Sequence, residues 1–254
     1  MKINRLIACA LAACSVACGD DNPAAPGPSP GSRVTELFIG ALPVGGSSFY
    51  SIGFPESTQV RVTLVGLSSE AGALLPGTLT LRLGIPSGTG CAAMSSAPNV
   101  APGFAAQLVS QLNTGTYCVS VEDTGGLTQT TNFLVRINQI PNSALSPDPP
   151  APSTETFASN LAVRGTSART FRATAAGPLT VTLQSIGPPS SANVDVSIGI
   201  PREDGTGCLI GRTERGGALL QMSTSVDAGN YCVLLTDFGS LTAPVSFTLT
   251  IAKP

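Results

Sequence analysis

The sequence predicts an all-β protein built from two tandem antiparallel β-sandwiches of the jelly-roll or immunoglobulin-like type, with about seven strands each. First, apolar and polar residues alternate in many short segments such as VRVTLVGL (60–67), and a period of two is typical of half-buried strands. Second, only 11% of the 254 residues are charged, whereas Gly (28) and Pro (21) are frequent, which favours short strands and tight turns. Third, the two halves of the chain repeat one another.

The repeat consists of five segments that recur in the same order in both halves. They are TELFIGAL (35–42) and TETFASNL (154–161), SSFYSIGF (47–54) and ARTFRATA (168–175), STQVRVTLVGL (57–67) and AGPLTVTLQSI (176–186), LRLGIPSGTGC (81–91) and VSIGIPREDGTGC (196–208), and GTYC (115–118) and GNYC (229–232). Five ordered matches indicate that one domain has been duplicated. Because a single sheet cannot cover its own apolar face, each copy is expected to close as a pair of sheets.

The first copy contains seven segments with strand periodicity, separated by turn clusters such as PVGGSS, SGTG and DTGG. We expect strands near residues 36–42, 47–53, 58–66, 78–85, 105–112, 115–122 and 130–138. The second copy repeats this set within residues 157–252. The expected domains are therefore repeat 1 at 35–139 and repeat 2 at 154–254. A Pro-rich linker at 140–153 joins them and favours extended polyproline geometry.

Residues 1–18 have the features of an export signal. A short positive segment, MKINR, precedes an apolar run that is too short to span a bilayer. The small residues that follow resemble a bacterial lipoprotein signal, in which a Cys becomes lipidated. Cys18 is the predicted lipidation site because polar sequence begins directly after it, with Cys14 in LAAC, or cleavage without lipid, as alternatives. Residues 19–34 are expected to form a disordered Pro-rich tether.

Four further cysteines form an even set, Cys91, Cys118, Cys208 and Cys232. In an exported chain such cysteines close into disulfides. Their order along the chain makes Cys91–Cys118 and Cys208–Cys232 the simplest pairing, with one bridge in each copy. Adjacent strand residues point to opposite faces, so the Cys that follows Tyr in GTYC and GNYC should lie on the outer side of its sheet. A structural bond that closes a loop of this length stabilises by roughly 3.5 kcal/mol.

Three segments of the second copy resemble bacterial pre-peptidase C-terminal domains. They are FRATAAGPLTVTL (171–183), NVDVSIGI (193–200) and DAGNYCVLL (227–235), and the resemblance extends over nearly all of each copy. It implies a small β-sandwich of the kind found on secreted proteins. The sequence departs from that family in the Cys after Tyr, and no protease segment accompanies the repeats. A generic immunoglobulin-like sandwich is the alternative.

The sequence contains no His, which excludes Ser-His-Asp and Cys-His catalysis and removes the commonest zinc ligand. It has no basic run, so nucleic acid is not an expected partner. The candidate acids are Glu122, Asp123, Glu203, Asp204 and Asp237. We interpret them as solvated turn residues, with calcium ligation and acid–base catalysis as alternatives. We therefore expect no catalytic residue, no cofactor and no metal ligand.

Aromatic and basic residues give no clear ligand platform. Of the tyrosines, Tyr117 and Tyr231 are interpreted as core-edge residues, and Tyr50 is the remaining candidate for a sugar contact. The arginines of the second copy are scattered over turns and strand faces, which favours a solvated surface, with a weak anionic contact surface as the alternative. These arginines are Arg164, Arg169, Arg172, Arg202, Arg212 and Arg215.

The predicted function is that of a non-enzymatic exported lipoprotein. Its lipid would anchor two disulfide-stapled sandwiches at the bacterial cell envelope, on the periplasmic or cell-surface side. There they would bind or assemble with an envelope protein, an extracellular protein or a glycan. The alternatives are a carbohydrate-binding accessory module and a hydrolase with an unrecognised carboxylate site.

Overall fold

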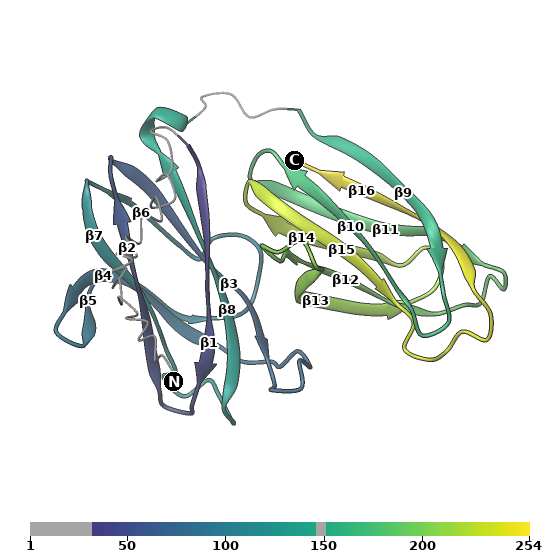
Figure 1. Ribbon diagram of the computed structural model, residues 1–254, viewed down its shortest axis with the longest axis horizontal. Coiled ribbons are helices and arrows are strands. Elements are labelled where there is room, and N and C mark those ends of the chain that lie inside the picture. The colour runs from purple at the N-terminus through teal and green to yellow at the C-terminus, as the bar shows by residue number, and fades with distance from the viewer. Residues whose placement is uncertain (1–31, 146–150) are drawn as a thin grey trace, which may run out of the picture.

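The computed structural model describes residues 32–145 and 151–254. This described chain folds into sixteen strands and one short 3-10 helix, η1 (Asn142–Ala144), and contains no α-helix. The strands form four antiparallel sheets of four strands each. Figure 1 shows the first half, purple to teal, beside the second half, green to yellow. The all-β fold class predicted from the alternation is confirmed. Within the described ranges, no helix is long and apolar enough to cross a membrane.

The first half contains eight strands. They are β1 (Val34–Leu42), β2 (Ser47–Phe54), β3 (Thr58–Ser68), β4 (Leu79–Ser87), β5 (Gly90–Val100), β6 (Leu108–Leu112), β7 (Gly115–Glu122) and β8 (Thr131–Pro141). One sheet has the order β1-β8-β3-β6 and the other β2-β7-β4-β5. A cluster of buried apolar side chains, including Leu64, Leu81, Val119 and Val135, fills the space between them. Seven of the strands lie where the sequence predicts them, and β5 is an additional eighth.

The second half repeats this topology. Its strands are β9 (Ser153–Leu161), β10 (Thr166–Ala173), β11 (Gly177–Gly187), β12 (Val194–Pro201), β13 (Cys208–Gly216), β14 (Gln221–Val226), β15 (Gly229–Thr236) and β16 (Val245–Lys253). The sheet orders, β14-β11-β16-β9 and β10-β15-β12-β13, match those of the first half strand for strand. The duplication therefore extends from the sequence to the order of strands in each sheet.

The two halves pack against one another. The apolar core of the second half includes Val65, Phe104 and Leu134, all from the first half. Val65 and Leu134 lie on the outer face of sheet β1-β8-β3-β6, which a free sandwich would expose to solvent. Thr63 on the same face is also fully buried. The second half thus covers the central part of the outer face of this sheet, whose inner face packs against its own partner sheet.

Candidate functional site

Both disulfide bonds expected from the sequence are present. Cys91 and Cys118 have a Cα–Cα distance of 5.9 Å, and Cys208 and Cys232 one of 6.1 Å. Cys118 and Cys232 are fully buried, but neither belongs to the apolar cluster between the two sheets of its half. Their sulfur atoms therefore lie on the outer sides of the sheets, as the alternation in GTYC and GNYC indicates. The bonds act as structural staples.

In each half, the strand that lies between the two cysteines carries a glycine that lets it approach the neighbouring edge strand closely. Gly84 pairs with Cys118 next to a bulge in β5, and a Cβ there would lie 2.0 Å from the carbonyl oxygen of Ala92 in β5. Gly199 has the same place in β12, where a Cβ would lie 2.3 Å from the carbonyl oxygen of Leu209. Because only glycine permits this approach of two backbones, both copies have a glycine at this position.

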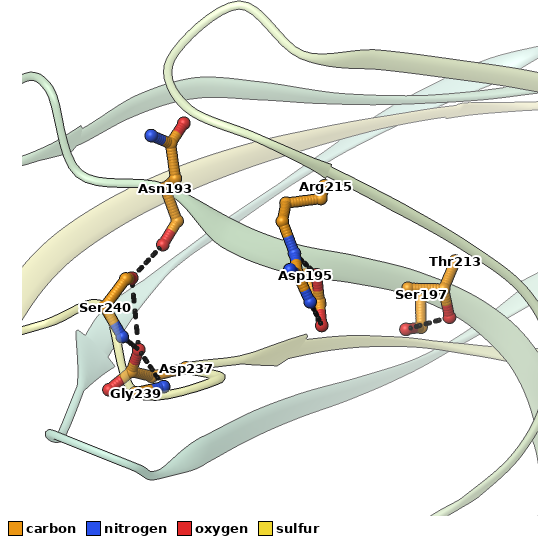
Figure 2. Close-up of polar contacts among 8 residues, drawn as sticks. All are labelled: Asn193, Asp195, Ser197, Thr213, Arg215, Asp237, Gly239 and Ser240. Carbon is orange, nitrogen blue, oxygen red and sulfur yellow. Dashed lines mark hydrogen bonds and ion pairs between the residues drawn. The ribbon is translucent and has the colours of Figure 1, made fainter. Parts of the chain in front are cut away.

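Asp237 holds a loop together. Its Oδ1 accepts hydrogen bonds from the backbone N–H groups of Gly239, Ser240 and Leu241, and its Oδ2 accepts one from Arg164; Figure 2 shows the contacts with Gly239 and Ser240. Burial raises the pKa of Asp237, but the four backbone hydrogen bonds outweigh it and lower the pKa to about 2. The side chain is 4% exposed, so the interpretation of Asp237 as a solvated turn residue is wrong.

Asp123 has the same role in the first half. Its Oδ1 accepts hydrogen bonds from the N–H groups of Gly125, Gly126 and Leu127, and its Oδ2 accepts one from Gly45. The bond from Gly45 lowers the pKa of Asp123 against the effect of burial, and the three loop amides lower it further. Asp123 is also 4% exposed and is not a solvated turn residue. Both acids therefore serve the fold, which explains their place in the repeated motif.

The remaining candidate acids do not converge on a catalytic or metal site. Glu122 forms an ion pair with Arg82. Asp204 accepts hydrogen bonds from the backbone and hydroxyl of Thr206 in an exposed turn. Glu203 is exposed and lines a cavity between the two halves. Within residues 32–145 and 151–254, no group of three or more His, Cys, Asp or Glu residues is placed to hold a metal ion.

The outer face of β12 and β13 carries polar pairs that satisfy one another (Figure 2). Arg215 donates two hydrogen bonds to Asp195, at 2.7 and 3.0 Å, and the hydroxyls of Ser197 and Thr213 lie 2.7 Å apart. The guanidinium of Arg215 also lies 3.5 Å from the ring centroid of Phe238. These pairs fit an ordinary solvated face.

The two halves are joined by the loop between β5 and β6, which carries Phe104. This side chain is 2% exposed, and its ring meets that of Tyr231 edge to face, with centroids 6.0 Å apart. The backbone of Phe104 forms a parallel bridge with Val226. Its carbonyl oxygen accepts hydrogen bonds from the backbone N–H of Asp227 and from Arg136 Nη2, at 3.2 and 2.8 Å. Phe104 is therefore an integral part of the second core.

A buried carboxylate ties the same loop and β3 to the second half. Asp227 is 1% exposed and forms an ion pair with Arg61 of β3. Its Oδ2 also accepts a hydrogen bond of 3.0 Å from the backbone N–H of Ala106. The Tyr231 hydroxyl donates to the Asp227 carbonyl oxygen at 2.8 Å. Each polar group of Asp227 thus contributes to one network that spans the two halves.

Arg136 on β8 is the most unusual residue of this junction. It is 1% exposed, and its guanidinium carbon lies 4.9 Å from the ring centroid of Tyr231. Nη2 donates to the Phe104 carbonyl, but Nε and Nη1 have no hydrogen-bond partner. No ion pair within 4.0 Å joins Arg136 to a carboxylate in the described part of the chain. The sequence does signal this residue, as a single Arg inside the apolar strand segment NFLVRINQI (132–140).

Two adjacent cavities lie at this junction, and we call them together the junction cleft. One, of about 290 Å³, is lined by Thr35, Leu37, Arg136, Ile200, Pro201, Arg202, Glu203, Gly229 and Asn230. The other, of about 240 Å³, is lined by Arg33, Val34, Thr35, Asn138, Gln139, Ile140, Arg172, Ala228, Gly229 and Asn230. Thr35, Gly229 and Asn230 line both cavities, and residues of both halves form the walls of each. The junction cleft is therefore the candidate functional site.

Comparison with known proteins identifies no family for this chain. No family model matches it, and no curated protein matches it in sequence. Among solved structures, the PBSX exported protein XepA is 13% identical, with 87% of this chain and 86% of that chain covered and a TM-score of 0.31. PNGase F, a glycosylasparaginase from Flavobacterium meningosepticum, is 9% identical, with 87% and 96% covered and a TM-score of 0.28. A Paenibacillus xanthan lyase is 10% identical, with 88% and 25% covered and a TM-score of 0.24. Scores this low carry no argument about function.

Asp237 provides a test of the loop network. Replacing it with Asn is expected to lower the melting temperature at pH 7, because Asn places an NH₂ group or a neutral oxygen where a carboxylate accepts four bonds. The folded pKa of about 2 lies below the value of about 3.9 for an unfolded Asp. The stabilisation is therefore present above the unfolded pKa and is lost as the pH falls through 2. Thermal melts should show the gap between wild type and variant narrowing from pH 6 to pH 2.

Glu70→Gln is the matched control, because Glu70 is an exposed acid. Its melting temperature should follow that of the wild type at every pH. A gap for Asp237→Asn that stays constant over the same pH range would show that the Asp237 carboxylate does not stabilise the loop through its charge.

Proposed function

We propose that this chain is an exported lipoprotein without enzymatic activity, which acts in binding or assembly at the bacterial cell envelope. The observation that carries the proposal is the pair of disulfide bonds, one in each half, because such bonds persist in oxidising compartments outside the cytoplasm. The resemblance to pre-peptidase C-terminal domains, which occur on secreted proteins, supports the same compartment. Lipidation is proposed at Cys18, with Cys14 as the alternative. Both lie outside the described residues.

The hydrogen bonds of the candidate acids favour a binding role over catalysis. Asp123 and Asp237, the two acids of the repeated motif, are occupied by backbone amides, and a hydrolase with paired carboxylates would need two that converge. The junction cleft is lined by one acid, Glu203. A sugar-binding module of the usual kind needs exposed aromatic rings. Tyr231 is fully buried and therefore offers no ring to a sugar, whereas Tyr50 is 37% exposed and stays the candidate for a sugar contact.

Mass spectrometry of the mature N-terminus tests the anchor. We expect a diacylglyceryl-modified Cys18, and we expect that globomycin, which inhibits lipoprotein signal peptidase, leaves the precursor uncleaved. Cys18→Ser should abolish the modification, while Cys14→Ser should leave it intact. An unmodified N-terminus produced by cleavage at another position would contradict the proposed anchor. Pull-down of envelope proteins and glycans with the mature protein then tests the binding role.

A further inference from the structure

We propose that the junction cleft binds a small anionic ligand, whose carboxylate, sulfate or phosphate oxygens accept hydrogen bonds from Arg136 and Asn138. This inference rests on the proposed binding function and deepens it by naming the chemical class of the ligand. The proposed site exists only where the two halves meet, because residues of both halves form its walls.

Buried donors without partners gather at this place. Arg136 lies opposite Thr63 in the β8–β3 ladder, and Asn138 follows two residues along β8 and hence on the same face. The three side chains are 1%, 0% and 5% exposed, respectively. The atoms without a hydrogen-bond partner are Arg136 Nε and Nη1, Thr63 Oγ1 and Asn138 Nδ2, four of the six such buried atoms in the described chain. Because buried polar groups are almost always satisfied, the three unpartnered atoms that belong to cleft-lining residues, two on Arg136 and one on Asn138, point to a bound molecule with several acceptor oxygens. Thr63 lines neither cavity.

The charge of the site specifies an anion. A buried guanidinium without a carboxylate partner is unfavourable unless another negative group approaches it. Asp227, the acid of the junction network, is already paired with Arg61. Arg33, Arg172 and Arg202 are exposed and line the cleft. With Arg136, four arginines line the cleft. The cleft is lined by one acid, Glu203, so its lining carries a net positive charge.

The dimensions of the site limit the ligand to a small molecule. Each of the two cavities, of about 290 and 240 Å³, lies just below the range for sites of drug-sized molecules, about 300–1,000 Å³. The almost fully buried Arg136 lines the first cavity and the almost fully buried Asn138 the second, and Asn230 lines both. The Thr35 hydroxyl donates to Asn138 Oδ1 at 2.9 Å and so holds the amide of Asn138 in place. This arrangement fits a single acidic sugar or a comparable small acid better than a polymer.

Titration of the mature protein with small anions tests the inference. The probes are D-galacturonate, sulfate and phosphate, with D-galactose as the neutral control, at constant ionic strength. Calorimetry should show saturable binding of at least one anion and none of galactose. In ¹⁵N-edited NMR spectra, the Arg136 Nε–H signal, assigned through its backbone, should shift along the same titration curve. Selectivity for galacturonate over sulfate and phosphate would identify the ligand as an organic acid, and the reverse order would identify it as an inorganic oxyanion.

Variants at the exposed rim are expected to leave the fold intact, because exposed positions contribute little to stability, and they separate binding from structure. Arg172→Glu should weaken anion binding at least about tenfold, because it places a like charge at the entrance. Arg169→Glu is the matched control, since Arg169 is an exposed arginine on the same strand that does not line the cleft, and it should change the affinity less than about twofold.

An Arg136 Nε–H signal that no anion shifts, or equal affinities for Arg172→Glu and Arg169→Glu, would overturn the inference and leave Arg136 as a structural bridge between the halves. Either result would leave the tests of export, lipidation and partner binding unaffected. Failure of this inference is therefore distinguishable from failure of the proposed function.

Discussion

Phe104→Ala is expected to destabilise the second sandwich by about 3–5 kcal/mol, the range for removing a buried aromatic side chain, although Phe104 belongs to the first. The substitution empties a position in the second core and removes the ring contact with Tyr231. Native-state hydrogen exchange should show the loss in amides of β11, β14 and β15. Protection of β4 and β7, in the sheet of the first half that lies away from the junction, should change less.

Phe49→Ala is the control for this prediction, because Phe49 is an exposed phenylalanine of the first half, at 39%. Its effect should stay within about 1 kcal/mol, since exposed positions outside special features contribute little. If Phe104→Ala left the protection of the second half at its wild-type level, the packing of Phe104 into that core would not contribute to its stability.

Removing either disulfide is the other change with a large expected effect. The sequence separations of 27 and 24 residues give roughly 3.5 kcal/mol for each bond in the chain-entropy model, within an observed range of about 2–5 kcal/mol for small secreted domains. Cys91→Ser with Cys118→Ser, and Cys208→Ser with Cys232→Ser, should each lower the urea midpoint of unfolding. Dithiothreitol should lower the midpoint of the wild type and have no effect on a variant that lacks all four cysteines. A wild-type midpoint that dithiothreitol does not change would exclude a stabilising role for the bonds.

The alternation was sufficient to predict seven of the eight strands of the first half, because it is a local pattern. The order of the four cysteines in the two copies was sufficient to predict the disulfide pairing. β5 was missed because its sequence, GCAAMSSAPNV, consists largely of small and exposed residues at a sheet edge and has no apolar face. The loop-holding role of Asp123 and Asp237 was missed as well. In both copies the Asp is followed by a Gly two residues later and a Leu four residues later, which fits a side chain that accepts bonds from its own turn.

The repeat does not predict the junction, because the residues that form the junction are those in which the two copies differ. The outer face of the first half carries Leu134 and Arg136, where aligned strand registers place Thr248 and Thr250 in the second half. On the neighbouring strands, the fully buried Val65 corresponds to the exposed Gln184. The substitution of polar by apolar residues on one outward face indicates that this face is covered. The aligned sequences could not show what covers this outward face. Phe104 lies in a loop, APGF, that has no counterpart in the other copy.

The central claim is that the two sandwiches form one rigid body with a shared cleft, although a Pro-rich segment joins them. Residual dipolar couplings of backbone N–H groups, measured for both halves of the mature protein in one aligned sample, test this most directly. The contacts of Phe104, Arg136 and Asp227 predict that a single alignment tensor fits the couplings of both halves. Two tensors of different magnitude and orientation, as expected for modules that move independently on an extended linker, would contradict the claim.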